Sequence, residues 1–270
     1  MAEICFRIAG GIDQERLRRI LAAWSILFAV SGPLDDYVDR DKLPAEWDAL
    51  GQGTGTFVAL ALIAEAILLT MGSGEKPDAT LCEAGRVFTR YLKEASLGQA
   101  MDALGVQTLE AYEAMLARKA GSLVAALTES IAVIAEADSR TQHAFADFGH
   151  ELGLAIQIVN DYQAGLWRPD VLAKDGMGDL DGPKRTYPIF FALQVTHTLS
   201  GEFHELLAEK PGRRNVPRML EILNEMGVPE FMLAAIEVRR TRAIRHLEIF
   251  ASSDELNEVR RWCDAHLLGR

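Results

Sequence analysis

Apolar residues recur along most of the chain at the three- and four-residue spacing of amphipathic helices. The first such run starts near Asp13 and places Leu17 and Ile20 on one face. Pro33 is expected to kink or interrupt this helix, and a further helical turn is expected from about Leu34. More helices are predicted over residues 53–71, 79–97, 108–135, 139–163, 187–206, 216–226 and 229–250. Strand patterns are nearly absent, so the sequence predicts an all-α fold.

Short segments with glycine and proline separate these runs, and none of them has the composition of an interdomain linker. The chain has 270 residues and is 49% hydrophobic, which is enough for one large helical domain with a deep core. We therefore predict a single-domain helical bundle over residues 1–270. In such a bundle, ligand and metal sites are built from side chains on facing helices.

The net charge of −11 argues against a nucleic-acid partner, because binding to a phosphate backbone needs a basic surface. Cys5, Cys82 and Cys263 have no metal-ligand spacing, and the N-terminus has no secretion signal, so a cytoplasmic location is expected. The most apolar run, residues 56–71, contains Glu65 and is shorter than the roughly 20 residues of a membrane span. We interpret it as a buried core helix and expect no integral membrane segment.

Two acidic clusters interrupt this apolar pattern. The first comprises Asp35, Asp36 and Asp39, and the second comprises Asn160 and Asp161. Positions i and i+4 share a face of a helix, so Asp35 and Asp39 should project side by side. Such oxygen ligands suit Mg²⁺, which commonly leaves coordination positions open for substrate phosphates. If the two clusters face each other across a bundle, they form a clamp for one metal-bound diphosphate.

Further polar residues lie between and after the acidic clusters. Gln99 and Asp102 are three residues apart and share a helical face. Lys119 precedes the small residues Ala120, Gly121 and Ser122, which would let its helix approach a neighbour closely. A glycine-rich segment after the second cluster contains Lys174 and Lys184. Lysine is a flexible point charge for phosphate, so these lysines are candidate diphosphate ligands.

These residues resemble the motifs of the trans-isoprenyl diphosphate (polyprenyl) synthases and of their class I terpene-synthase relatives, over roughly residues 5 to 250. Asp35, Asp36 and Asp39 match the first DDxxD motif. Gln99 and Asp102 match the GQxxD element, and Lys119 matches the lysine of the KTAxL element. Gln157, Asn160 and Asp161 fall on the second motif, QxxDDxxD. The segment from Lys174 through Lys184 to Pro188 fits the K-x₄-D-L-x₃-K-x-T-x-P pattern. Five motifs in order are a specific resemblance.

The resemblance implies a class I isoprenoid synthase, with a helical bundle around a central active-site cavity and a homodimeric assembly. It implies two or three Mg²⁺ ions, held by Asp35, Asp36, Asp39, Asn160 and Asp161. It also implies that the substrate diphosphate is bound by Lys119, Lys174, Lys184, Gln99 and Gln157. The catalytic residues would be Asp35, Asp36, Asp39 and Asp161.

Departures from the family pattern concern the site for isopentenyl diphosphate. Residues 40–42 read Arg-Asp-Lys where chain-elongating members have Arg-Arg-Gly, and the chain begins after the point where a GGKxxRP element would lie. The N-terminal helix of the family is therefore expected to be absent. In the second motif, Asn160 and Ala164 replace aspartates. The Asn-Asp pair resembles that of the relatives that prenylate a pheromone peptide.

Three functions are compatible with this pattern. The first is ionisation of an allylic prenyl diphosphate, followed by cyclisation or by transfer of the prenyl cation to an acceptor other than isopentenyl diphosphate. The second is ordinary chain elongation with isopentenyl diphosphate, and the third is a non-catalytic prenyl-binding subunit. Val30, Ser31 and Gly32 are modest or small, which in this family favours a 15- or 20-carbon substrate.

Overall fold

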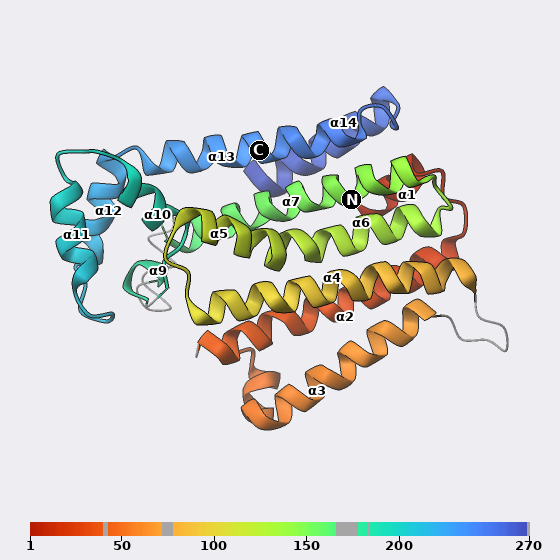
Figure 1. Ribbon diagram of the computed structural model, residues 1–270, viewed down its shortest axis with the longest axis horizontal. Helices are drawn as coiled ribbons and strands as arrows, with labels where there is room; N and C mark the ends of the chain where they lie inside the picture. Colours follow the sequence, from red (N-terminus) through yellow and green to blue (C-terminus); the bar gives the residue numbers. More distant parts are fainter. Residues whose placement is uncertain (40–42, 72–77, 166–177, 183, 269–270) are drawn as a thin grey trace.

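In the computed structural model, the described residues are 1–39, 43–71, 78–165, 178–182 and 184–268. All regular elements in these ranges are helical, which confirms the predicted all-α single domain (Figure 1). The long helices are α2 (Gln14–Asp39), α3 (Ala45–Met71), α4 (Ala79–Leu104), α7 (Ser139–Gly165) and α13 (Val228–Leu247). The shorter elements are α1 (Ala2–Ile8), α5 (Leu109–Leu116), η1 (Ala117–Gly121), α6 (Ser122–Ile134), α9 (Gly178–Asp181), α10 (Tyr187–Gln194), α11 (Ser200–Ala208), α12 (Val216–Glu225), α14 (Ser253–Cys263) and η2 (Asp264–Leu268).

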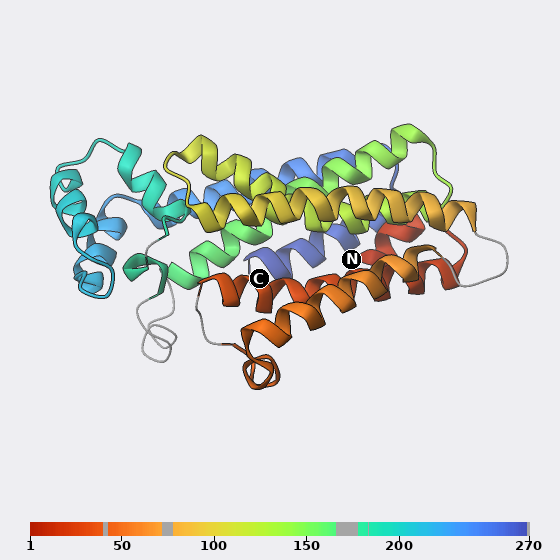
Figure 2. The same ribbon diagram turned by 60° about the horizontal axis from the view of Figure 1, so that its bottom comes forward.

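The long helices are arranged side by side, with α6 near the middle (Figures 1 and 2). Helix α6 packs against α4 and α7, and α7 in turn packs against α13. Residues 125–134 of α6 are all buried, as expected for a mostly apolar helix, and the buried Glu129 is paired with Arg90 of α4 at 2.7 Å. Phe88 of α4 and Phe148 of α7 are fully buried. Each such side chain stabilises the fold by about 1.5–3 kcal/mol relative to an exposed one.

Three helices differ from their predicted bounds near the acidic clusters. Helix α2 continues through Pro33 to Asp39, so the helix is not interrupted there, and a kink at Pro33, the other predicted outcome, stays a prediction. Pro33 is buried, and the turn after it is anchored by contacts of Asp35 with neighbouring elements. Helix α3 begins at Ala45 and is bent where Gly51 has a φ of 69°, a conformation open to glycine. Helix α4 extends to Leu104, so Gln99 and Asp102 both lie on it.

The predicted helix 187–206 is wrong, because it is divided into α10 and α11. Val195 is extended, and the Ser200 hydroxyl donates a hydrogen bond to the Val195 carbonyl at 3.0 Å. The same hydroxyl oxygen accepts from the His197 amide at 3.0 Å. Serine side chains compete for backbone groups in this way, and the local bonds replace those of a continuous helix.

The expectation that residues 56–71 form a buried core helix is also wrong. Only Gly55, Ala59, Ala66 and Thr70 of α3 are buried. The opposite face is open to solvent, where Phe57 is 74% and Leu68 is 58% exposed. Helix α3 lies at the outside of the bundle in both views (Figures 1 and 2).

Helices α2 and α3 are each long and apolar enough to cross a membrane, judged by length and composition alone. The argument that residues 56–71 are too short to span therefore fails, because α3 has 27 residues. Core helices of bundles pass the same test, and α2 packs against α3, α4 and α6 in this fold. The absence of an integral membrane segment stays a prediction.

Candidate functional site

The last turns of α2 bring the first acidic cluster against α4 and η1. The Gln99 side-chain amide donates a hydrogen bond to Asp35 Oδ1, and Lys119 Nζ lies 3.0 Å from Asp35 Oδ2. Lys119 Nζ also donates to Asp102 Oδ2 at 2.8 Å. Lys184 Nζ donates to the same oxygen at 3.0 Å. The structure thus joins these five side chains, which were selected from the sequence, into one network.

This network is partly buried, since the side chains of Lys119 and Asp102 are 18% and 14% exposed. Burial lowers the pKa of Lys119, but Asp35 and Asp102 more than offset this effect, and the net pKa is raised. Burial likewise raises the pKa of Asp102, and Lys119 and Lys184 outweigh it, so its net pKa is lowered. At neutral pH Lys119 and Asp102 are therefore both charged, and each offsets the charge of the other.

Lys119 lies within η1, a π-helical turn between α5 and α6. Single π-turns inside helices occur often at functional sites. A Cβ atom on Gly98 of α4 would overlap the backbone nitrogen of Lys119, and one on Gly153 of α7 would overlap the Ala120 carbonyl. Glycine at these two positions lets both helices close on η1, which confirms that the lysine-bearing segment approaches its neighbours closely.

Asp161, in the second acidic cluster, is 3% exposed and accepts hydrogen bonds on both carboxylate oxygens. Gln157 Nε2 donates to Oδ1 at 3.0 Å, and the Tyr187 amide donates to Oδ2 at 3.3 Å. The Tyr112 hydroxyl also donates to Oδ2. A buried carboxylate needs such donors to stay charged. Asp161 consequently joins α7 to α5 and to the start of α10.

Two connections link the network of Asp35 and Asp102 to the contacts of Asp161. The first is the continuous α5–η1 helix, on which Tyr112 contacts Asp161 and Lys119 contacts Asp35. Tyr112 and Lys119 are seven positions apart, which is about 10 Å at 1.5 Å per residue. Lys184 and Tyr187, which contact Asp102 and Asp161, are three residues apart. The contact networks of Asp35 and Asp161 are therefore adjacent, and their joint binding of one metal-bound diphosphate stays a prediction.

Some predicted site residues cannot be placed in this network. Lys174 and the side chain of Asp39 lie outside the described residues. Asp36 is partly buried beside Asp35, and Asn160 is exposed next to Asp161. Their assignment as ligands stays a prediction.

The donor chemistry of the site fits a hard cation at the end of α2. Among the side chains described there, the carboxylates of Asp35, Asp36, Asp102 and Asp161 outnumber the ammonium groups of Lys119 and Lys184. Within the described part of the chain, no three acidic, histidine or cysteine side chains converge as a ready metal cage. Mg²⁺ fits such an open arrangement, since it usually keeps positions for water and phosphate oxygens.

Sequence reasoning selected Gln157 but missed Tyr112 and Tyr187, the other two residues that donate hydrogen bonds to Asp161. Tyr112 is 3% exposed, and the Tyr187 hydroxyl donates to Glu113 Oε1 at 3.0 Å. Burial, reinforced by Glu113, raises the pKa of Tyr187 to about 12, so this hydroxyl stays protonated. Helical spacing offered one signal, because Tyr112 precedes Lys119 by seven residues and so shares its face. No local pattern could pair Tyr187 with Glu113.

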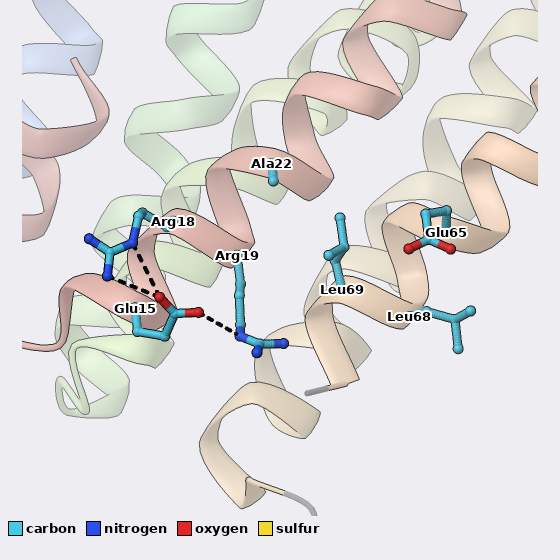
Figure 3. A pocket seen from close by; sticks show the side chains of 7 residues that line it. All are labelled: Glu15, Arg18, Arg19, Ala22, Glu65, Leu68 and Leu69. Atoms are coloured by element: carbon cyan, nitrogen blue, oxygen red, sulfur yellow. Dashed lines mark hydrogen bonds and ion pairs between the residues drawn. The ribbon is translucent and has the colours of Figure 1, made fainter. Parts of the chain in front are cut away.

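A separate hollow of about 500 Å³ lies between the first turns of α2 and the last turns of α3 (Figure 3). Arg18 and Arg19 line one side, where both contact Glu15, and Glu65 and Leu68 line the other. Arg19 precedes Asp35 by sixteen residues of α2, which is about 24 Å along the helix. The hollow is therefore distinct from the acidic site.

The layered bundle and its paired acidic clusters define the isoprenoid-synthase class of all-α folds. Residues 3–225 match the family model described as "Polyprenyl synthetase". This match covers most of the chain, and the chain belongs to the polyprenyl synthetase family.

Two curated relatives and one solved structure illustrate the similarity. The chain is 33% identical over 171 residues to a geranylgeranyl diphosphate synthase of Mycobacterium tuberculosis, covering 59% of this chain and 47% of the relative. It is 29% identical over 195 residues to one of Sulfolobus acidocaldarius, covering 68% and 59%. The chain thus spans about half the length of the curated relatives it matches.

The fold is similar to that of a polyprenyl synthase from Caulobacter crescentus, solved in complex with calcium and isoprenyl diphosphate. The TM-score is 0.83 at 22% identity, with coverage of 100% of this chain and 83% of that one. At this identity the comparison supports the fold alone.

Proposed function

We propose that this chain is a prenyltransferase that ionises an allylic prenyl diphosphate and joins the prenyl group to isopentenyl diphosphate. The observation that supports this most is the contact of Lys119 with both Asp35 and Asp102, which places an ammonium group beside carboxylates suited to a metal. The names of the relatives favour chain elongation over the cyclisation or alternative transfer that the motif departures suggested.

In this proposal the chain's own residues bind and orient the diphosphate. Lys119 and Lys184 each have three N–H donors and use some of them on Asp102. Rotation of either ammonium group can turn a donor toward a diphosphate oxygen while Asp102 keeps the group in place. The side-chain amide of Gln99 holds the Asp35 carboxylate in place by donating a hydrogen bond to it. Donors held in advance stabilise developing negative charge without reorganisation.

Asp35, Asp36 and Asp39 would hold Mg²⁺ at the end of α2, with Asn160 and Asp161 as the predicted ligands on the opposite side. When bound, Mg²⁺ supplies Lewis-acid stabilisation of the charge that develops on the leaving diphosphate. Because the relatives include geranylgeranyl diphosphate synthases, a 15- or 20-carbon allylic chain remains our proposed substrate range.

A second candidate function is transfer to another acceptor or cyclisation. The sequence of residues 40–42 and the replacement of an aspartate by Asn160 favour it, since both depart from the elongating pattern. A third candidate, a non-catalytic prenyl-binding subunit, rests on Ala164 alone.

One assay separates these functions. Purified protein with Mg²⁺ is incubated with geranyl, farnesyl or geranylgeranyl diphosphate, with and without isopentenyl diphosphate and indole, and products are identified by mass spectrometry. We expect diphosphate release together with a product one isoprene unit longer. Release without isopentenyl diphosphate supports the second candidate. Binding without release supports the third, and neither binding nor release overturns all three.

Asp36→Asn and Lys119→Gln variants test the residues that the proposal uses. Each should lower kcat/KM by about 100-fold or more, because loss of a single stabilising group in such sites has effects of this size. Asp254→Asn, an exposed acid on α14, is the matched control and should retain wild-type activity. Equal activity of Asp36→Asn and wild type would remove the acidic site from the mechanism.

We also propose a homodimer formed through the exposed face of α3. Phe57, Leu60, Leu68 and Met71 are 74%, 55%, 58% and 49% exposed and share this face. An exposed apolar face of this kind usually marks a surface that binds a protein or a membrane. Glu65 on α3, with Arg18 and Arg19 across the hollow, favours a protein partner over lipid. A second copy offers the same complementary surface by two-fold symmetry. The cytoplasm is our proposed compartment.

A further inference from the structure

The segment from Lys184 to Tyr187 is held at both of its ends. Lys184 is bonded to Asp102 of α4, and the Tyr187 amide is bonded to Asp161 of α7. This short segment thus connects Asp102, a partner of Lys119, with Asp161 of the second acidic cluster. Displacement of Tyr187 would therefore act on a segment that also carries Lys184.

Tyr187 is fixed by contacts with three elements, α5, α7 and α13, through its backbone, hydroxyl and ring. Its hydroxyl donates to Glu113 Oε1 of α5 at 3.0 Å. Its ring lies edge-on to Tyr112 at 6.0 Å and stacks on Phe231 of α13 at 5.9 Å. Tyr187 is only 6% exposed, so its ring has little freedom to take another rotamer.

Glu113 depends in turn on Arg239 of α13. Arg239 Nη2 lies 3.7 Å from Glu113 Oε1, and Arg239 Nη1 lies 3.1 Å from Glu151 Oε2 of α7. The side chains of Arg239 and Glu151 are 20% and 18% exposed. The positive charge of the Arg239 guanidinium thus offsets the negative charges of two carboxylates, one on α5 and one on α7. Without it, Glu151 would lose its cation partner at low solvent access, and Glu113, whose side chain is 41% exposed, would lose the charge that holds it beside Tyr187.

We propose that Arg239 is a positioning residue for the diphosphate site: through Glu113 it holds Tyr187, and Tyr187 sets both the Asp161 carboxylate and the position of Lys184. This inference rests on the proposed function for the identity of the ligand. Arg239 itself touches none of the acidic residues or lysines of the site among the contacts described, so its effect would be transmitted through Tyr187.

The first test measures order in the segment and needs no ligand. Arg239→Gln and Tyr187→Phe are compared with wild type by amide hydrogen exchange of peptides that cover residues 184–190. Both variants should exchange at least several-fold faster there. Arg218→Gln is the matched control, because Arg218 is an ion-paired arginine that bonds Glu202 at 2.6 Å on another part of the surface. Unchanged exchange in Arg239→Gln would overturn the inference.

The second test measures ligand binding by titration of inorganic pyrophosphate with Mg²⁺. Arg239→Gln and Tyr187→Phe should each weaken binding about tenfold, and the double variant should be no weaker than Tyr187→Phe alone, because both changes break one chain of contacts. Arg239→Lys should recover part of the loss. Additive losses, or wild-type affinity in Arg239→Gln, would contradict a positioning role.

These outcomes are separate from those of the prenyl assay. If wild type binds pyrophosphate but turns over no allylic diphosphate, the proposed function fails while the effect of Arg239 on binding can still be measured. If wild type is an active prenyltransferase and Arg239→Gln keeps its KM, kcat and Mg²⁺ requirement, the inference fails alone. If wild type binds no pyrophosphate, both fail.

Discussion

Lys119 is the residue whose contacts connect α2, α4 and η1 at the site. It is a partly buried cation with two carboxylate partners that come from different helices, and it lies on a turn of unusual geometry. Burial of an unpaired ammonium group would cost free energy, and the carboxylates of Asp35 and Asp102 offset this cost by pairing with Lys119. The same pairing keeps the lysine charged, which a phosphate ligand requires.

Acid should weaken this network in a way that depends on Asp102. Its folded-state pKa is lowered below the ordinary value of 3.8, so its contribution to stability is complete above about pH 4 and is lost as the pH falls further, through the lower folded-state pKa. Asp102→Asn should cost about 2 kcal/mol at pH 7, the scale of a hydrogen bond to a charged group. Urea unfolding from pH 7 to pH 3 should show a smaller drop in Asp102→Asn than in wild type. Parallel pH profiles would contradict this prediction.

At this scale the sequence predicted the residue types better than their partners. Asp35, Asp102, Lys119 and Lys184 were selected as conspicuous charged residues, and Gln99 because it shares a helical face with Asp102. The contacts of Asp161 with Tyr112 and Tyr187 were not foreseen, since 49 and 26 residues separate the partners. Such pairs depend on tertiary packing, and the spacing of residues within one helix does not indicate them.

At the scale of elements, long apolar periodicity predicted the long helices well. Ends and interruptions were less predictable, as Pro33 and the turn at Val195 show. Helix α14 was missed although Ser252 and Glu255 form a capping box, a pattern that is visible in the sequence. The π-turn η1 could not be predicted, because its sequence is compatible with a regular helix and the packing of α4 and α7 decides its geometry.

Replacement of Gly98 by alanine should disturb η1 as a unit. The added methyl group would overlap the backbone of Lys119, which has no flexible end that can move aside. We expect a loss of stability of about 1–3 kcal/mol, typical of overpacking, and a loss of kcat/KM of about 100-fold from displacement of Lys119.

Gly201→Ala in α11 is the control for this experiment, because no atom lies within 4 Å of its added methyl group. Its stability should stay within about 0.5 kcal/mol of wild type, as for most surface substitutions. Thermal unfolding and steady-state kinetics of both variants provide the comparison. A fully active and stable Gly98→Ala protein would show that the close approach of α4 to η1 is dispensable.

At the scale of the whole molecule, the apolar face of α3 is the feature that the bundle leaves uncovered. Wild type should sediment at twice the chain mass of 29.7 kDa if a second copy covers this face. Leu60→Lys and Leu68→Lys, which place charges on it, should shift the protein toward the monomer. Ile249→Lys, at a residue that is 67% exposed after α13, should not.

Two results would overturn this arrangement. A wild-type protein that is monomeric and floats with lipid vesicles would indicate a membrane as the cover for α3. A lysine at Leu60 that leaves the dimer unchanged would place the interface elsewhere. Analytical ultracentrifugation and vesicle flotation distinguish these outcomes at the same protein concentration.

The contact between Lys119 and Asp35 has a thermodynamic consequence for how the site fills. In the structure Lys119 and Asp35 are counter-ions for each other, so a cation that binds Asp35 and an anion that binds Lys119 each displace a partner that the other can use. A cation that takes over Asp35 frees the ammonium group for phosphate, and phosphate on Lys119 frees the carboxylate for the cation. By reciprocity, each ligand must then raise the affinity of the other by the same factor.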